Sequence, residues 1–281
     1  MNFCKRGFPG LSSMMNEFKR FQKTISAKRK SGQDTPVPDN LTVFAKMVEI
    51  LPPRSVCDHL VALYFYNGEK SMRIIHLPSF LRECQQFWEN RALPATPFHG
   101  FVPQLYAVMV IASCWDDSKV FRDHLANYYM NEAIISRMIE AWLAGLDWKH
   151  RIELSTLRTQ CLLYITHQLH LAAPMERVWT NAGTAVRMAM TMGLHRDPNE
   201  FPNISIFEGE QRRRLWATVV EMDLQMSLLS GCPALVRDGD YNCAPPSNVD
   251  DLQLYEEMTE YPETKPIDEW TDCTLQVLLA K

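Results

Sequence analysis

The apolar residues between Glu208 and Ser230 recur at alternating spacings of four and three positions. This spacing places side chains on one face of an α-helix, so the segment predicts a single long amphipathic helix. The apolar stripe consists of Leu215, Val219, Met222, Met226 and Leu229. Such a helix becomes stable mainly when other elements cover its stripe, which requires a body of packed helices.

Helical periodicity continues through almost the whole chain from residue 41 onward, and only residues 234–237 could be extended. Short connections between helices favour antiparallel neighbours. We therefore predict an all-α fold, a large irregular multi-helix bundle of antiparallel helices. The expected helices cover residues 55–66, 78–88, 101–115, 120–146, 155–170, 174–193 and 208–230.

Residue types at the ends of these segments support the boundaries. Ser55 and Ser155 are expected N-caps, and Pro174 is expected to open its helix. Gly193 and Gly231 are expected to end the last two helices, because glycine adopts the left-handed conformation found just after a helix. The segment 101–115 is apolar on nearly all sides, which predicts a central buried helix.

The net charge of -4 is distributed unevenly along the 281 residues. Residues 1–40 carry eight Lys and Arg against three Asp and Glu, a net charge of +5, which leaves -9 for the rest. We interpret residues 1–40 as a basic, partly disordered tail and linker, and residues 41–281 as one helical domain. A basic arm can contact nucleic acid or serve as an import signal, although a solvated tail is the simpler interpretation. The candidate contacts are Lys19, Arg20, Lys23, Lys28, Arg29 and Lys30.

The sequence carries no feature typical of a membrane protein, a secreted protein or an enzyme. The longest apolar run, 106–115, is shorter than the ~20 residues of a membrane span. The eight cysteines are scattered singly, which favours a reducing compartment. No G-x-G pair and no G-x-S-x-G elbow occur. His167 and His170 have a spacing that could hold a metal, but we interpret them as surface or capping residues.

The helix at 208–230 also contains polar residues that must be accounted for. Asp223 lies in line with Trp216 on the flank of the stripe, and an unpaired buried carboxylate costs several kcal/mol, roughly. We expect Arg187 or Arg196 to pair with Asp223. Three consecutive residues point in widely different directions on a helix. At least one arginine of the triplet Arg212, Arg213 and Arg214 is therefore expected to pair inward, with the others solvated.

The segment from Glu210 through the arginine triplet, Trp216 and Asp223 to Gly231-Cys-Pro233 resembles a known sequence pattern. It is similar to the regulatory middle homology region of fungal zinc-cluster (Zn2Cys6) transcription factors. Three companion pieces accompany it, which makes four in all. They are an opening piece made of 51–54, 60–66 and 76–80, the segment 192–197, and the segment 245–251. Together these pieces cover residues 50–255 in the expected order.

The resemblance implies a transcription regulator that acts in the nucleus through its helical domain, with pathway-specific control of secondary metabolism. It also implies possible homo- or heterodimers with zinc-cluster factors and a possible small-molecule effector. Cys4 and Cys57 are too far apart for the six-cysteine cluster that binds zinc and reads DNA in this family. We therefore expect no cofactor in this chain unless a cluster precedes it, and only weak or indirect DNA contact. We also expect the regulatory region to continue beyond Lys281.

Two alternatives stay open at this point. The chain could be a non-DNA-binding interaction module that heterodimerises with full-length zinc-cluster factors and modulates them. More remotely, it could be a helical metabolic enzyme.

Overall fold

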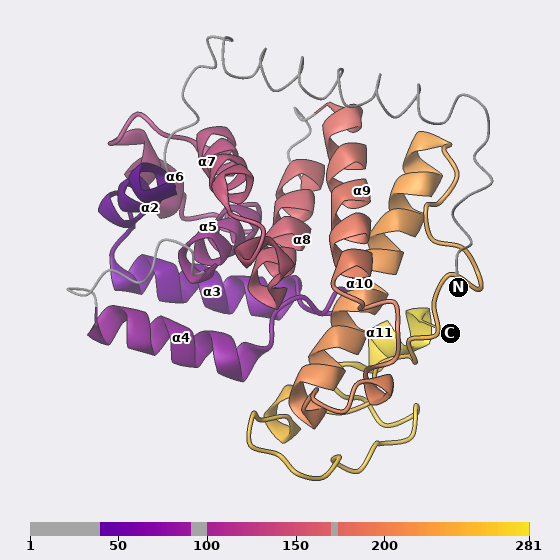
Figure 1. The fold of residues 1–281 in the computed structure, drawn as a ribbon. Helices are drawn as coiled ribbons and strands as arrows, with labels where there is room; N and C mark the ends of the chain where they lie inside the picture. Colours follow the sequence, from indigo (N-terminus) through magenta and orange to yellow (C-terminus); the bar gives the residue numbers. More distant parts are fainter. Residues whose placement is uncertain (1–39, 91–99, 170–173, 281) are drawn as a thin grey trace, which may run out of the picture. The chain divides into compact units, whose positions relative to one another are not determined.

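The computed structural model describes residues 40–90, 100–169 and 174–280 (Figure 1). This part of the chain contains α-helices, three short 3-10 helices and no strand, which confirms the all-α multi-helix fold. The helices of the first half are α2 (Asn40–Glu49), α3 (Arg54–Asn67), α4 (Leu77–Glu89), α5 (Phe101–Ala112), α6 (Val120–Ala126) and α7 (Glu132–Gly145). Those of the second half are α8 (Leu154–Leu169), α9 (Met175–Thr191), α10 (Ile206–Ser230) and α11 (Thr274–Leu279). The 3-10 helices are η1 (His150–Ile152), η2 (Pro198–Glu200) and η3 (Asp251–Gln253).

Helix α5 is the centre of the hydrophobic core. All twelve of its residues are buried, as its uniformly apolar sequence predicts. Helices α2, α3, α7 and α8 pack around it. The hydroxyl of Tyr106 donates to the backbone oxygen of Met47 at 2.8 Å, so the largest polar side chain of the helix is satisfied within the core.

Helices α8, α9 and α10 lie side by side, and α9 packs against both α8 and α10 (Figure 1). The small residues Ala182, Ala185 and Ala189 of α9 are buried, which lets neighbouring helices approach closely. Gly193 and Gly231 follow α9 and α10 with φ angles of 77° and 67°. Both glycines therefore adopt the left-handed conformation predicted for them.

The predicted helix 120–146 is wrong, because the structure divides it into α6 and α7. Tyr129 takes a left-handed φ of 56° between them. The side chain of Asn131 then accepts a hydrogen bond from the N–H of Ile134 and starts α7 as its N-cap. The apolar spacing continues across this break, which explains why the sequence pattern concealed it.

Two predicted N-caps are also wrong by one or two residues. Helix α3 begins at Arg54 after Pro53, and α8 begins at Leu154, so Ser55 and Ser155 lie inside the first turns. Pro174 is the N-cap of α9, and Ser205 caps α10 by accepting from the N–H of Glu208.

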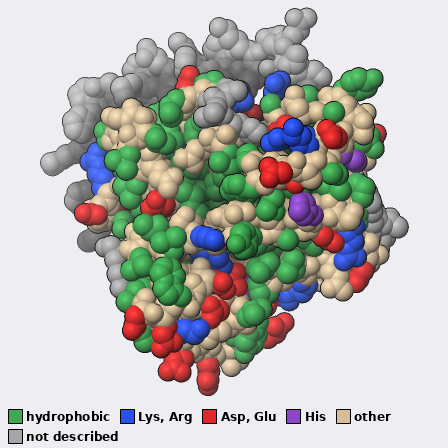
Figure 2. Space-filling model, turned by 180° about the vertical axis from the view of Figure 1, so that it is seen from behind, with side chains coloured by type: hydrophobic (Ala, Val, Ile, Leu, Met, Phe, Trp, Pro, Cys, Tyr) green, Lys and Arg blue, Asp and Glu red, His purple; other side chains and the backbone are tan. Residues whose placement is uncertain are grey.

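An irregular segment follows α10 and leads to α11. Residues 254–272 contain seven acidic residues against one lysine, and acidic side chains gather along the lower edge of the face in Figure 2. The amide of Asn248 donates to the carbonyl oxygens of Lys265, Pro266 and Glu269. Its own carbonyl accepts from the hydroxyl of Thr274 at 2.8 Å. Asn248 thus fastens this segment to the helical body.

Some residues singled out in the sequence lie outside the ranges that the structure describes. The candidate nucleic-acid contacts between Lys19 and Lys30 lie outside the described residues, as does His170.

Among the helices that the structure describes, none has the length and apolar character needed to span a bilayer.

Candidate functional site around the arginine triplet

Helix α10 holds the three arginines of the triplet against different parts of the body. Arg212 donates to Glu208 at 2.9 Å and to the carbonyl oxygen of Met192 at 3.2 Å. Its side chain is only 18% exposed. Arg213 and Arg214 are both buried and ion-paired, so more than one arginine of the triplet pairs inward. The prediction that the other arginines are solvated is wrong, because Arg212 is mostly buried and hydrogen-bonded.

Arg213 binds Asp197 through two hydrogen bonds, with Nη2 to Oδ1 at 2.9 Å and Nε to Oδ2 at 3.3 Å. Its remaining nitrogen contacts the hydroxyl of Tyr261. Burial opposes the charge of Arg213, but the hydrogen bond to Asp197 and the nearby Tyr261 raise the pKa of the guanidinium. Asp197 also accepts from the N–H of Ala244 at 3.0 Å. One carboxylate therefore joins α10 to the loop before it and to the segment after it.

Arg214 forms the centre of a second, deeper ion pair. Its Nη1 donates to Asp251 Oδ1 at 2.6 Å, and its Nε lies 3.4 Å from Glu210. Arg73, from the loop after α3, donates to the same oxygen of Asp251 at 2.5 Å. All four side chains are buried. The single carboxylate of Asp251 is therefore shared by two guanidinium groups, one from the loop after α3 and one from α10.

The loop before α4 completes the surroundings of Asp251. The second carboxylate oxygen accepts from the N–H of Leu77 at 3.2 Å. The backbone oxygen of Asp251 lies 2.9 Å from Nε2 of His76, so this nitrogen carries the proton. In the neutral ring, Nδ1 then accepts from the hydroxyl of Ser79 at 2.9 Å. Burial lowers the pKa of His76, which favours this neutral form.

Glu69 adds a buried carboxyl group beside Arg73. It accepts from the hydroxyl of Tyr64 at 2.7 Å and from the N–H groups of Ile74 and Ile75 at 3.0 and 2.9 Å. Burial raises the pKa of Glu69 to about 7, against the opposing effects of Arg73 and Tyr64. The group therefore titrates near neutral pH inside the core.

These contacts bring together the four sequence pieces that carry the family resemblance. The first piece supplies His76, the second Asp197, the third the arginine triplet, and the fourth Asp251. Sequence reasoning missed Asp251, although the segment 245–251 was recognised, because no local spacing links it to Arg73. The conclusion is that the pattern encodes a buried ionic network. Six of its members are buried and one is half-buried, and these are Arg73, Arg213, Arg214, Glu69, Glu210 and Asp251, with Asp197 half-buried.

The predicted pairing of Asp223 with an arginine is wrong. Asp223 is buried, but its Oδ2 accepts from the N–H groups of Leu235 and Val236 at 2.7 and 2.9 Å. The left-handed Gly231 reverses the chain after α10 and returns these amides to the carboxylate. Backbone donors thus satisfy the group that the sequence assigned to a guanidinium.

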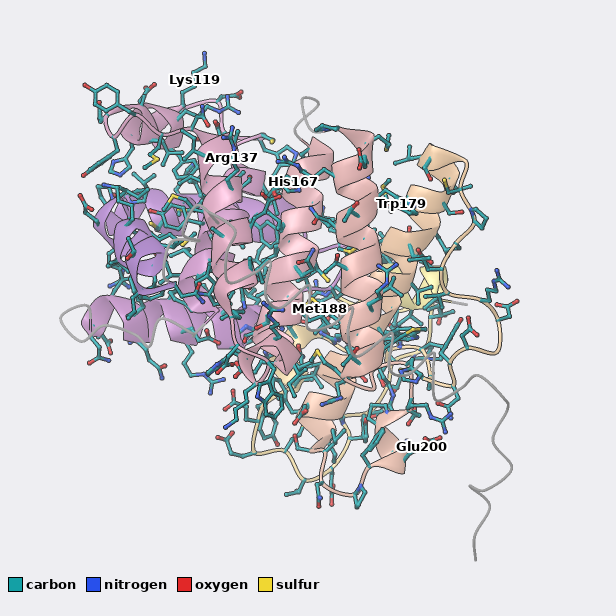
Figure 3. The ribbon with its side chains drawn as sticks, turned by 45° about the horizontal axis from the view of Figure 1, so that its top comes forward. Lys119, Arg137, His167, Trp179, Met188 and Glu200 are labelled. Atoms are coloured by element: carbon teal, nitrogen blue, oxygen red, sulfur yellow. The ribbon has the colours of Figure 1, made fainter. Side chains whose placement is uncertain are left out.

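The two proposed arginine partners lie elsewhere. Arg196 pairs with Glu200 at 2.9 Å near the surface, where Figure 3 labels Glu200 in η2. Arg187 is exposed, with its guanidinium over Gly183. Pro233 lies in the loop after α10 and lines a shallow depression with Trp179. None of these residues joins the buried network around Asp251.

His167 also differs from its predicted surface role. Its ring is buried between α7 and α9 (Figure 3). Nδ1 contacts the amide of Asn181, and Nε2 lies 3.5 Å from Glu140. Within the described ranges, no group of three or more His, Cys, Asp or Glu side chains is placed to hold a metal ion.

A pocket of about 240 Å³ opens beside the network. Trp216 and Tyr241 form one aromatic wall, with ring centroids 5.5 Å apart. Val220 and Leu224 of α10 and Leu279 of α11 contribute apolar surface. Arg213 and Glu221 supply the charged groups of the lining. Trp216, which the sequence places on the flank of the apolar stripe, is thus both buried and part of a pocket wall.

The structure is thus an all-α helical domain with an internal ionic network and a pocket beside α10. Comparison with known proteins assigns its family. The family described as fungal specific transcription factor domain matches residues 61–268, and the chain belongs to it.

Curated relatives support this assignment. Transcription factor opdR of Penicillium oxalicum is 31% identical over 96% of this chain and 32% of its own length. The fusarisetin A cluster transcription factor fsa6 of a Fusarium species is 30% identical over 78% of this chain and 30% of its own. The Zn(2)-C6 fungal-type transcription factor mpsB of Macrophomina phaseolina is 33% identical over 79% and 30%, respectively. The chain thus spans about a third of these relatives, which are named as transcription factors rather than enzymes. No solved structure matches the chain significantly.

Proposed function

We propose that this chain is the regulatory domain of a fungal transcription factor that acts in the nucleus and controls genes of secondary metabolism. The observation that carries the proposal is that contacts of one ionic network join the four family sequence pieces, through His76, Asp197, the arginine triplet and Asp251. The names of two relatives, the fusarisetin A and equisetin cluster transcription factors, support the link to metabolite gene clusters.

The proposed mechanism is a shift between conformations of the helical body. The network fastens α10 to the loops on either side of it, so α10 and its neighbours form one unit. A ligand or partner that binds one conformation better than another changes the population of the two. DNA contact by this chain is proposed to be weak or indirect, with sequence reading left to a zinc cluster.

Transcription from a reporter tests this proposal. The full chain, fused to a foreign DNA-binding domain and directed to the nucleus, is expected to change reporter expression relative to the DNA-binding domain alone. A fusion carrying Asp251→Ala is the control, because it removes the centre of the network and should lose the effect. Unchanged expression with the wild-type fusion and with the unfused chain would contradict the proposal.

A second candidate is an interaction module that forms heterodimers with full-length zinc-cluster factors. Exposed leucines on the C-terminal half of α10 favour it, because Leu224 and Leu228 lie one turn apart and are 46% and 84% exposed. Co-purification with a co-expressed relative is expected to be lost on Leu228→Glu and kept on Leu252→Glu, a control at another exposed leucine. If the wild-type chain captures no relative, this candidate is wrong.

A further inference from the structure

The pocket beside Trp216 contains a carboxylate without a cationic counterpart. Glu221 lines the pocket from α10 and is half-buried. One of its oxygens accepts from the amide of Gln225 at 2.8 Å. Within the described part of the chain, no Lys, Arg or His forms an ion pair with Glu221. Its negative charge is therefore available to a molecule in the pocket.

The basic residue that lines the pocket does not offset the negative charge of Glu221. Arg213 is the one basic residue among the described residues that line the pocket. Its guanidinium is already bound by Asp197 through two hydrogen bonds and lies 3.8 Å from Glu210. With Arg213 neutralised in this way, the pocket carries the net negative charge of Glu221. An anionic molecule would meet repulsion, and a cation would meet attraction.

The rest of the pocket suits an aromatic group. Trp216 and Tyr241 meet edge to face, and Val220, Leu224 and Leu279 surround them. A dry cavity of about 150 Å³ can hold a benzene molecule. The volume of about 240 Å³ found here therefore accommodates one aromatic ring with a short side chain. Aromatic faces also attract cations directly.

We propose that this pocket binds a small arylalkylamine, with its aromatic ring beside Trp216 and Tyr241 and its ammonium group at Glu221. The proposal rests on the regulatory function above, since such a molecule would act as an effector of the domain. Binding itself can be measured without any transcription readout, so the two proposals can fail separately.

Three probes with the same ring and chain length separate charge from shape. These are 3-phenylpropylamine, 3-phenylpropanol and 3-phenylpropionate, added to the isotope-labelled full chain. The indole N–H signal of Trp216, assigned with Trp216→Phe, reports on the pocket because its Nε1 is buried without a hydrogen-bond partner. The amine is expected to shift this signal saturably. It should bind about tenfold more tightly than the carboxylate.

Two variants test the site. Glu221→Gln keeps the shape and is expected to weaken the amine about fivefold without affecting the alcohol. Glu257→Gln, at an exposed position in the acidic segment, is the matched control and should bind like wild type. Ala217→Leu fills the pocket and should abolish binding of all three probes, with its thermal unfolding showing that it is folded.

Equal affinity for the amine and the carboxylate would overturn the proposal. An amine affinity that is unchanged in both Glu221→Gln and Ala217→Leu would also overturn it. Absence of binding by all three probes at millimolar concentration would also overturn it. If the reporter fusion is active while no probe binds, the regulatory function stands and the ligand class is wrong. If the amine binds while the reporter is silent, the pocket stands and the regulatory function is wrong.

Discussion

The variant Asp251→Ala is expected to lower the free energy of unfolding by about 3 to 5 kcal/mol, because it leaves two buried guanidinium groups without their shared carboxylate. Arg73 and Arg214 lie 2.5 and 2.6 Å from the same oxygen, and both are buried. Urea unfolding at pH 7, followed by far-ultraviolet circular dichroism, measures the loss.

The control for this substitution is Asp238→Ala, at an exposed aspartate. It should change the free energy of unfolding by less than about 0.5 kcal/mol. Burial alone would raise the pKa of Asp251, but Arg73 and Arg214 hold it below the usual value. The stability contributed by Asp251 is therefore present above about pH 4 and lost as the pH falls further. A loss below about 1 kcal/mol in Asp251→Ala would show that the network does not stabilise the fold.

The second large effect is expected in the pH dependence of stability. The pKa of Glu69 rises from 4.5 to about 7 on folding, mainly through burial. A group with a raised carboxyl pKa contributes stability below its unfolded pKa and loses it as the pH rises through the folded value. The wild-type chain should therefore lose about 3 kcal/mol between pH 4.5 and pH 7.5 through this group.

The variant Glu69→Gln removes this titration and should flatten the profile over the same range. The comparison concerns the slope of stability against pH. The amide nitrogen of glutamine replaces one of the two oxygens and so faces the N–H of either Ile74 or Ile75, which lowers stability at every pH. Glu260→Gln, at an exposed glutamate, controls for the loss of one carboxylate. Denaturant titrations at half-unit pH intervals give both profiles. A slope that is the same in wild type and Glu69→Gln would contradict the assignment.

Much of the fold could be predicted because its signals are local. The segment 101–115 is apolar on all sides, and helix α5 is buried on all sides. Gly193 and Gly231 end their helices because no other residue type adopts that conformation as readily. The break at Tyr129 and Asn131 could not be predicted, since the apolar spacing is the same on both sides of it.

The candidate site could be predicted only in part, because many of its contacts join residues that are far apart in the sequence. The arginine triplet and Trp216 stand out in the sequence, and the structure places them at the network and the pocket. Their partners are set by distant contacts. Asp251 and Arg73 are 178 positions apart, and no spacing rule reaches that far. The partner of Asp223 is backbone, and every residue except proline carries the same N–H group, so the sequence holds no sign of it.

The long sequence separation between Arg73 and Asp251 also limits the order in which parts of the chain can fold during synthesis. During synthesis, helices α2 to α9 leave the ribosome before the carboxylate that neutralises Arg73 has been made. The contacts among α2, α3, α5, α7 and α8 all lie within residues 40–169, so these helices can pack before the ionic centre closes. Until η3 has been made, Arg73 and His76 lack the contacts that Asp251 gives them in the folded chain.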